Sequence, residues 1–167
     1  YIIAPQHDNI SGNNVIKSIG ALHKFNNEVF EEVLDDNFKI PKINLISVII
    51  GGSNNHYDFS LKETVELVFK IKNIKKSNPE YNFLILHSRR TTKKMKDLLK
   101  NKLSDISIIL KEDEANPYTF ALKHSDFFIV TSDSTSMISE CAFTGKSIYI
   151  FHLPFKRKSK RIEKFHD

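Results

Sequence analysis

Short apolar runs alternate with segments of helical periodicity along residues 45–151. The runs are rich in β-branched and aromatic residues, which is typical of strands buried on both faces of a parallel sheet. They are LISVII (45–50), NFLILH (82–87), ISIIL (106–110), DFFIV (126–130) and SIYIF (147–151). Since strands and helices alternate, we predict an α/β fold with a Rossmann-like, doubly wound parallel sheet of about five strands. Right-handed crossovers then give the strand order 3-2-1-4-5.

Helix signals fill the gaps between these runs. Ser60 and Glu63 are spaced as a capping box, in which each side chain satisfies the other residue's backbone N–H group. The inward face of this helix, which extends to about Ser77, is predicted from the spacing of Leu61, Val65, Val68 and Ile71. Further helices are predicted from about Thr92 to Leu103, from Asn116-Pro117 to about His124, and from Thr135 to Thr144, before Gly145.

The first 40 residues do not continue this alternation. YIIAP (1–5) is predicted as the end of a strand, and GNNVIKSIGALHKF (12–25) and NEVFEEVLDD (27–36) as short amphipathic helices. The chain begins without Met in this strand, which favours a fragment of a longer protein. The predicted division is into the end of an N-terminal domain with an interdomain connector (1–40), the Rossmann-like domain (41–155) and a basic tail (156–167).

The predicted strand order brings two loops side by side. In such a sheet the winding reverses between the first and fourth strands, and ligands bind outside the carboxyl ends of these strands. The loop after the first strand begins with Gly51, Gly52 and Ser53, and the loop after the fourth strand is TSDSTS (131–136). We therefore expect a ligand-binding crevice between these two loops.

The hydroxyl-rich loop has two interpretations. Free backbone N–H groups at a helix start attract anions such as phosphate, and Asp133, Ser134 and Ser136 would orient them or bind the ligand. Glu140 shares a helix face with Ser136, and a carboxylate there accepts hydrogen bonds from two ribose hydroxyls. Alternatively, Asp133 or Ser134 only caps the helix, and Glu140 is a solvated surface residue.

Two other features at the carboxyl ends of the strands are equally open. Gly51 and Gly52 either make a tight turn or let the backbone approach a ligand closely. Arg89, which follows the second strand, either reaches a phosphate group or is a solvent-facing charge. The first loop lacks the GxGxxG fingerprint of dinucleotide sites, so we do not expect a nicotinamide cofactor.

Composition narrows the functional classes. Hydrophobic residues make up 40% of the chain, which is typical of a globular protein, and no apolar stretch is long enough to span a bilayer. The single cysteine, Cys141, excludes an internal disulfide and fits a reducing compartment. The histidines and acidic residues have no spacing diagnostic of a metal site, so no metal is predicted. The net charge of +5 is compatible with anionic partners.

Several longer motifs match one known pattern over almost the whole chain. They are IAPQHD, GNNVIKSIGALH, IIGGSNNHYDF, HSRRT, NPY and VTSDSTSMISECAFTGKSIYIF. Together they resemble the bacterial members of the family named after the plant mitochondrial-fission protein called "elongated mitochondria". The same stretches are similar to the nucleotide-binding C-terminal half of two-domain GT-B glycosyltransferases, including the enzyme that makes lipid II.

This resemblance implies a nucleotide-sugar site. It would be lined by Gly51, Gly52, Ser53, Ser134, Ser136, Met137 and Glu140, and Asn116, Pro117 and Tyr118 would approach the base or the phosphates. The glutamate would bind the ribose. The acceptor site and usual catalytic base of GT-B enzymes come mainly from the N-terminal half, of which only His7 and Asp8 are candidates here. The catalytic residues are therefore unknown.

The predicted function is to bind a nucleotide-sugar, of the uridine-diphosphate type, as half of a metal-independent GT-B-like glycosyltransferase. The missing N-terminal domain would be the other half, so residues 1–167 alone are expected to be inactive. One alternative is a non-catalytic interaction module with the same fold. Another is binding of anionic lipid or nucleic acid, of which nucleic acid is less favoured, through the basic tail. The expected location is the cytoplasm, with the inner membrane surface as a peripheral site.

Overall fold

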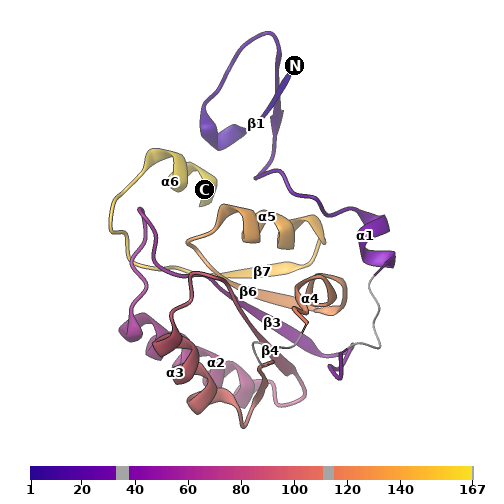
Figure 1. Cartoon of the computed structure of the whole chain (residues 1–167), viewed down its shortest axis with the longest axis vertical. Helices are drawn as coiled ribbons and strands as arrows, with labels where there is room; N and C mark the ends of the chain where they lie inside the picture. Colours follow the sequence, from indigo (N-terminus) through magenta and orange to yellow (C-terminus); the bar gives the residue numbers. More distant parts are fainter. Residues whose placement is uncertain (33–37, 111–114, 167) are drawn as a thin grey trace.

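The computed structural model describes residues 1–32, 38–110 and 115–166. Its body is a five-stranded sheet in which every pairing is parallel, with the order β5-β4-β3-β6-β7 (Figure 1). The strands are β3 (Leu45–Ile50), β4 (Asn82–His87), β5 (Ser107–Ile108), β6 (Phe127–Thr131) and β7 (Ser147–Phe151). Numbered from β3 in chain order, this is 3-2-1-4-5, so the predicted doubly wound, Rossmann-like sheet is confirmed.

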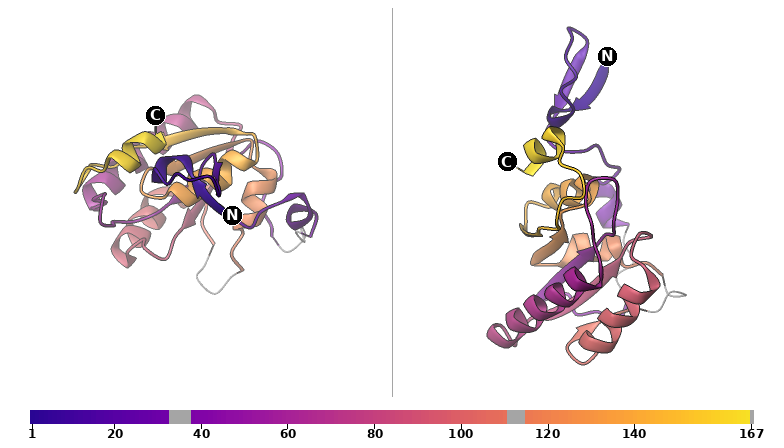
Figure 2. Two further views of the ribbon diagram at one scale, coloured as in Figure 1. Left: turned by 90° about the horizontal axis from the view of Figure 1, so that it is seen from above. Right: turned by 90° about the vertical axis from the view of Figure 1, so that its left-hand side faces the viewer.

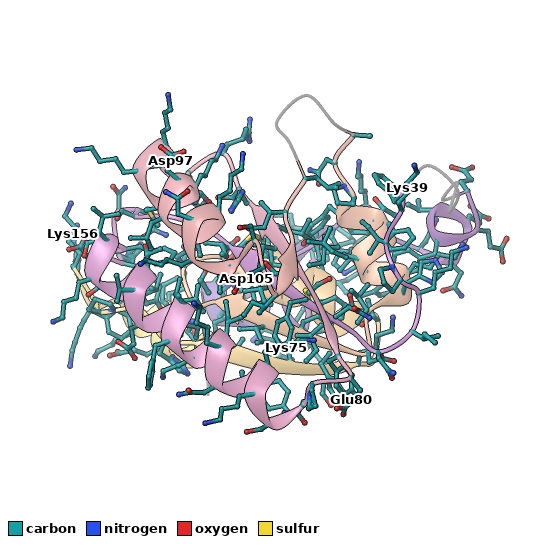
Figure 3. The ribbon with its side chains drawn as sticks, turned by 90° about the horizontal axis from the view of Figure 1, so that it is seen from below. Lys39, Lys75, Glu80, Asp97, Asp105 and Lys156 are labelled. Atoms are coloured by element: carbon teal, nitrogen blue, oxygen red, sulfur yellow. The ribbon has the colours of Figure 1, made fainter. Side chains whose placement is uncertain are left out.

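Helices cover both faces of this sheet. The helices α2 (Leu61–Ser77) and α3 (Lys93–Leu103) pack on one face, and α4 (Tyr118–His124) and α5 (Thr135–Phe143) pack on the other. Figure 3 shows the first face, where α2 and α3 lie side by side and Asp97 of α3 points away from the sheet. Because β3 is buried on both faces, all six of its residues are buried, as its continuous apolar pattern predicts.

The helix α2 confirms the predicted bounds and corrects the predicted inward face. The capping box is present, and the Glu63 carboxylate accepts a hydrogen bond from the Ser60 backbone N–H at 2.9 Å. Leu61 and Val65, however, are 43% and 54% exposed. Thr64 is buried instead, because its hydroxyl donates to the Ser60 carbonyl at 2.8 Å and thereby becomes compatible with an apolar surrounding. The inward face is Thr64, Leu67, Val68 and Ile71.

Two other predicted boundaries were wrong by a few residues. The strand predicted over residues 106–110 is paired only at Ser107 and Ile108, because β5 is an edge strand that meets β4 alone. The helix α4 begins at Tyr118, so Pro117 is its N-cap and not its first helical residue. Asn116 still acts in the turn, since its Oδ1 accepts a hydrogen bond from the Tyr118 N–H at 3.1 Å.

The N-terminal residues form a separate two-stranded parallel sheet, which with η1 (Gln6–Asp8) we call the arm. Its strands are β1 (Ile2–Pro5) and β2 (Val15–Ser18), and Figures 1 and 2 show that they stand away from the body. The strand predicted within residues 1–5 is confirmed, but the helix predicted over residues 12–25 is wrong. The β-branched pair Val15 and Ile16 instead aligns with β1, and a pairing partner overrides the local helical spacing.

A connector leads from the arm to the body. It contains the short helix α1 (Asn27–Glu31), which confirms the first part of the helix predicted over residues 27–36; positions 33–36 lie outside the described residues. At Gly20, φ is +75°, and the next N–H, of Ala21, donates to the Ser139 hydroxyl of α5 at 2.8 Å. A Cβ on Gly20 would lie 2.6 Å from that hydroxyl oxygen. The connector therefore packs closely against α5 at a position where only glycine leaves enough space.

The predicted basic tail is folded where it is described. Residues Lys160–His166 form α6, and Ile162 is buried in the core of the body. The Arg161 guanidinium donates to the Asp8 carboxylate at 2.8 Å, and the Lys164 ammonium donates to Asn9 Oδ1 at 2.9 Å. The helix α6 therefore joins the arm to the body (Figure 1). Among the residues described, no helix is long and apolar enough to cross a membrane.

Candidate functional site

The loops after β3 and β6 meet at the carboxyl edge of the sheet, as the strand order predicts. The backbone N–H of Gly51 donates to the Thr131 hydroxyl at 2.9 Å, and that of Gly52 donates to the Asp133 carboxylate at 3.1 Å. These bonds link adjacent parallel strands at the point where the winding of the sheet reverses. Gly51 and the TSDSTS loop thus lie side by side at the edge of the sheet where ligands of such folds bind.

The buried carboxylate of Asp133 joins the two loops by hydrogen bonds. Its side chain is fully buried, and its carboxylate accepts hydrogen bonds from the Thr131 hydroxyl at 2.6 Å and from the Arg90 guanidinium at 2.5 Å. Together with the bond from the Gly52 N–H, this carboxylate accepts hydrogen bonds from three groups. Of the two roles that the sequence left to Asp133, the structure places its side chain where it orients the loops.

The two glycines are explained by close approach of the protein's own atoms. Neither has a positive φ, so a left-handed turn does not require them. A Cβ on Gly51 would lie 2.0 Å from a carboxylate oxygen of Asp133, and one on Gly52 would lie 2.2 Å from the Arg90 carbonyl oxygen. The positions are therefore restricted to glycine by packing between loops, which is a third explanation beside the two that the sequence suggested.

Ser53 and Asn54 shape the loop that follows. The Ser53 hydroxyl accepts a hydrogen bond from the Phe59 N–H at 2.8 Å, which closes the loop over residues 53–59. The Asn54 amide donates to the Asp133 carbonyl at 2.9 Å, and its oxygen accepts from the N–H groups of His56 and Tyr57. Asn54 was not predicted as a site residue, although an asparagine two positions after a double glycine is a turn signal.

The helix α5 begins where the hydroxyl-rich loop ends. Ser134 is its N-cap, and the Ser134 hydroxyl accepts from the Met137 N–H at 3.4 Å. This confirms the capping interpretation for Ser134 and leaves the ligand interpretation open. Ser136 is exposed in the first turn, whereas Met137 is half-buried against the core. Ser136 is thus the predicted residue of this turn with its side chain most open to a ligand.

Glu140 is neither solvated nor free. It lies one turn after Ser136, it is half-buried, and its Oε2 accepts a hydrogen bond from the Tyr118 hydroxyl at 2.5 Å. Burial, followed by the bond to Glu140, raises the pKa of Tyr118, so the phenol remains a donor at physiological pH. Two residues that were predicted to contact different parts of a ligand are therefore in contact with each other.

A pocket of about 410 Å³ lies beside this pair, at the carboxyl ends of β4 and β5. Its wall includes Arg89, Asn116 and Pro117, which were all predicted site residues, together with the basic side chain of Lys96. Ile85 and Leu86 contribute apolar surface to its lining. Pro117 of this pocket directly precedes Tyr118, which donates to Glu140 of α5.

Two adjacent arginines have different positions. Arg89 lines the pocket, as predicted for a residue that meets a ligand. Arg90, for which the sequence left the same two interpretations as for Arg89, forms the ion pair with Asp133. No local feature of the sequence distinguishes them, since both follow the same strand. Only the turn over residues 88–91 directs their side chains differently.

The C-terminal helix contacts the TSDSTS loop at Ser132. The His166 ring nitrogen Nε2 lies 3.2 Å from the Ser132 carbonyl oxygen, and the Leu153 N–H donates to the Ser132 hydroxyl at 3.0 Å. His7 of the arm is buried against Phe165 of the same helix, with ring centroids 4.9 Å apart. The two candidates from the arm, His7 and Asp8, are therefore engaged by α6.

The comparisons with known proteins identify the family. The model of the family described as "Mitochondrial fission ELM1" matches residues 1–167. The chain belongs to this family. It is 33% identical over 155 residues to "Uncharacterized protein RP120" of Rickettsia prowazekii (strain Madrid E), an alignment that covers 89% of this chain and 43% of that protein.

A plant member is also similar. The chain is 27% identical over 143 residues to "Mitochondrial fission protein ELM1" of Arabidopsis thaliana, which covers 82% of this chain and 33% of that protein. The chain thus spans less than half the length of these two relatives. The predicted membership of the family is confirmed, and the predicted domain boundaries stay a prediction.

Proposed function

We propose that this ELM1-family chain binds a nucleoside diphosphate, as the nucleotide-sugar half of a GT-B-like glycosyltransferase. One observation carries the proposal. Ser136 and Glu140 lie one turn apart on α5, where the winding of the sheet reverses, and Glu140 is bonded to Tyr118, whose chain neighbour Pro117 lines a pocket of about 410 Å³. A nucleotide needs three features in this spatial order: an anion site for its phosphates, an acceptor for its ribose hydroxyls and a pocket for its base.

The diphosphate is assigned to the start of α5. The first backbone N–H groups of a helix have no partner within it and carry the positive end of the helix dipole. The hydrogen bonds of Asp133 and Asn54 fix the loop that leads into this helix, so these donors are held in place before a ligand arrives. Preorganised donors of this kind stabilise the negative charge that develops on a diphosphate leaving group during glycosyl transfer.

The ribose is assigned to Glu140 and the base to the adjacent pocket. A carboxylate with one oxygen bonded to Tyr118 retains acceptor capacity for the two hydroxyls of a ribose. Asn116 offers an amide and Arg89 a guanidinium at the pocket wall, and the apolar residues of the lining can pack against a base. We take the uracil of a uridine diphosphate as the base to test first.

We assign the second half of the enzyme to a position next to the arm. In the described arm, β1 and β2 leave several apolar residues half or more exposed, although parallel strands are stable when both faces are covered. They are Ile2, Ile3 and Ile16, and Ile19, which directly follows β2, is exposed as well. We propose that these residues pack against a further domain, which supplies the acceptor site.

A binding experiment tests the proposed function. Uridine diphosphate is titrated into the natural full-length protein and its Glu140→Ala variant by calorimetry. Loss of the charge-assisted bonds to the ribose should weaken binding roughly tenfold. The matched control is Glu66→Ala, which removes an exposed glutamate of α2 that pairs with Lys70. The proposal fails if the wild type binds no nucleoside diphosphate, or if Glu140→Ala and Glu66→Ala bind equally well.

A further inference from the structure

The hydroxyl of Tyr118 reaches Glu140 from a different helix. The phenol donates to Glu140 Oε2 at 2.5 Å, and the two residues are 22 positions apart in the chain. The Tyr118 ring is itself held in place: it is partly buried against the core cluster on this face of the sheet, and its centroid is 6.0 Å from that of Phe25 in the connector. A ring fixed on several sides gives its hydroxyl a fixed position.

We propose that Tyr118 is a positioning residue, which orients the Glu140 carboxylate so that the site selects a ribonucleotide over its 2′-deoxy form. This inference rests on the proposed function, because it concerns how the ribose is recognised. Tyr118 acts through Glu140 and need not touch the nucleotide.

The physical reason is the freedom of a glutamate side chain. A free carboxylate at the end of three rotatable bonds samples many orientations, and binding a ribose would have to restrict them. The bond from Tyr118 to one oxygen restricts them beforehand and leaves the other oxygen as an acceptor. A neutral donor also leaves the negative charge on Glu140, and burial, which raises the pKa of Tyr118, keeps that donor neutral.

A purely structural role for Tyr118 makes a different prediction. If the hydroxyl only satisfied Glu140 or stabilised the packing of α4 on α5, its loss would weaken all nucleotides alike. If Tyr118 contacted the base, its loss would change the preference among bases and not among sugars. Discrimination between ribose and deoxyribose is therefore the readout that isolates positioning.

The experiment compares two ligands in four proteins. Uridine diphosphate and 2′-deoxyuridine diphosphate are titrated into the natural full-length protein and into its Tyr118→Phe, Glu140→Ala and Tyr118→Phe/Glu140→Ala variants. The control for the chemical change is Tyr149→Phe, which removes the hydroxyl of a 60% exposed tyrosine on β7. Circular dichroism melting of each variant reports whether the fold is retained.

We expect the wild type and Tyr149→Phe to prefer the ribonucleotide roughly tenfold. Tyr118→Phe should reduce that preference to about threefold or less by weakening the ribonucleotide alone, and it should have no further effect in the Glu140→Ala background. Equal weakening of both ligands, or full additivity of the two substitutions, would overturn the positioning role while the proposed function stands. Failure of the wild type to bind either ligand would overturn the proposed function and, with it, this inference.

Discussion

The body and the arm are both parallel sheets made of β-branched and aliphatic residues, yet their environments differ. In the body, Ile49 of β3 is 2% exposed, because helices cover both faces of the sheet. In the arm, the paired residues Ile3 and Ile16 are each 53% exposed. Sequence pattern alone predicts a strand in either place, but the stability of a parallel pair depends on the layers around it.

The largest effect that this comparison predicts concerns apolar packing. Phe83→Ala empties a fully buried position in the body and should lower the free energy of unfolding by about 3–5 kcal/mol. Ile16→Ala in the arm should lower it by less than about 0.5 kcal/mol in the 167-residue chain. Urea denaturation measures both. Similar losses would show that the arm is as well packed as the body, whereas a larger Ile16→Ala loss in a longer natural form would reveal the covering domain.

A second pair of substitutions compares two aspartate–arginine contacts. Asp133 in the body is fully buried and serves three donors, so Asp133→Asn should cost about 1–3 kcal/mol. Asp8 in the arm is partly exposed and meets an Arg161 side chain that is 51% exposed, so Asp8→Asn should cost about 0–1 kcal/mol. The same denaturation series, repeated in high salt, separates them. Salt should diminish the Asp8 effect and leave the Asp133 effect in place.

A third comparison uses helix caps. Ser134→Ala removes the N-cap of α5, which contains the buried Cys141, and should lower global stability by about 1 kcal/mol. Asn26→Ala removes the N-cap of α1, in which no residue is buried, so this helix should fray without unfolding the body. Hydrogen exchange at the Met137 and Val29 amides distinguishes these cases. Faster exchange at Val29 with an unchanged melting temperature is the expected result for Asn26→Ala.

The smallest effect concerns the thiol of Cys141. Burial, followed by the nearby charge of Glu140, raises the pKa of this thiol above its ordinary value of 9.0. Since the folded pKa is the higher one, the stability from this group is present below pH 9.0 and is lost as the pH rises above it. At pH 8 a thiol reagent should therefore react with Cys141 only when the body opens. Phe83→Ala should speed the reaction and Ile16→Ala should not; an equal acceleration by both would contradict the separation of arm and body.

Local signals were sufficient where they agreed with the tertiary packing. Strands β3, β4 and β7 and the helix α2 have the predicted bounds, because apolar runs and a capping box mark their ends directly. The prediction failed at β2, where the helical spacing of residues 12–25 was overridden by pairing with β1. It also failed at Leu61 and Val65, where the apolar period fits two faces of α2 and only packing chooses between them.

The candidate site was predictable in outline and not in its contacts. Chain order and handedness sufficed to bring Gly51 next to the TSDSTS loop, because the connectivity of a doubly wound sheet leaves few alternatives. Nothing local to the sequence indicates that Arg90, and not Arg89, meets Asp133. The distinction depends on the turn over residues 88–91, which directs these two adjacent side chains differently.

The sequence by itself determined the parallel sheet, its strand order and the hydroxyl-rich start of α5, since these depend on periodicity, capping residues and chirality. Only the tertiary structure decided that Asp133 is buried and that Tyr118 donates to Glu140. It also decided that Gly51 and Gly52 lie too close to neighbouring loops to carry a Cβ. The Tyr118–Glu140 bond joins residues 22 positions apart, and the Gly52–Asp133 bond joins residues 81 positions apart. Such distances are set by how whole elements pack, and side-chain spacing along the chain carries no information about them.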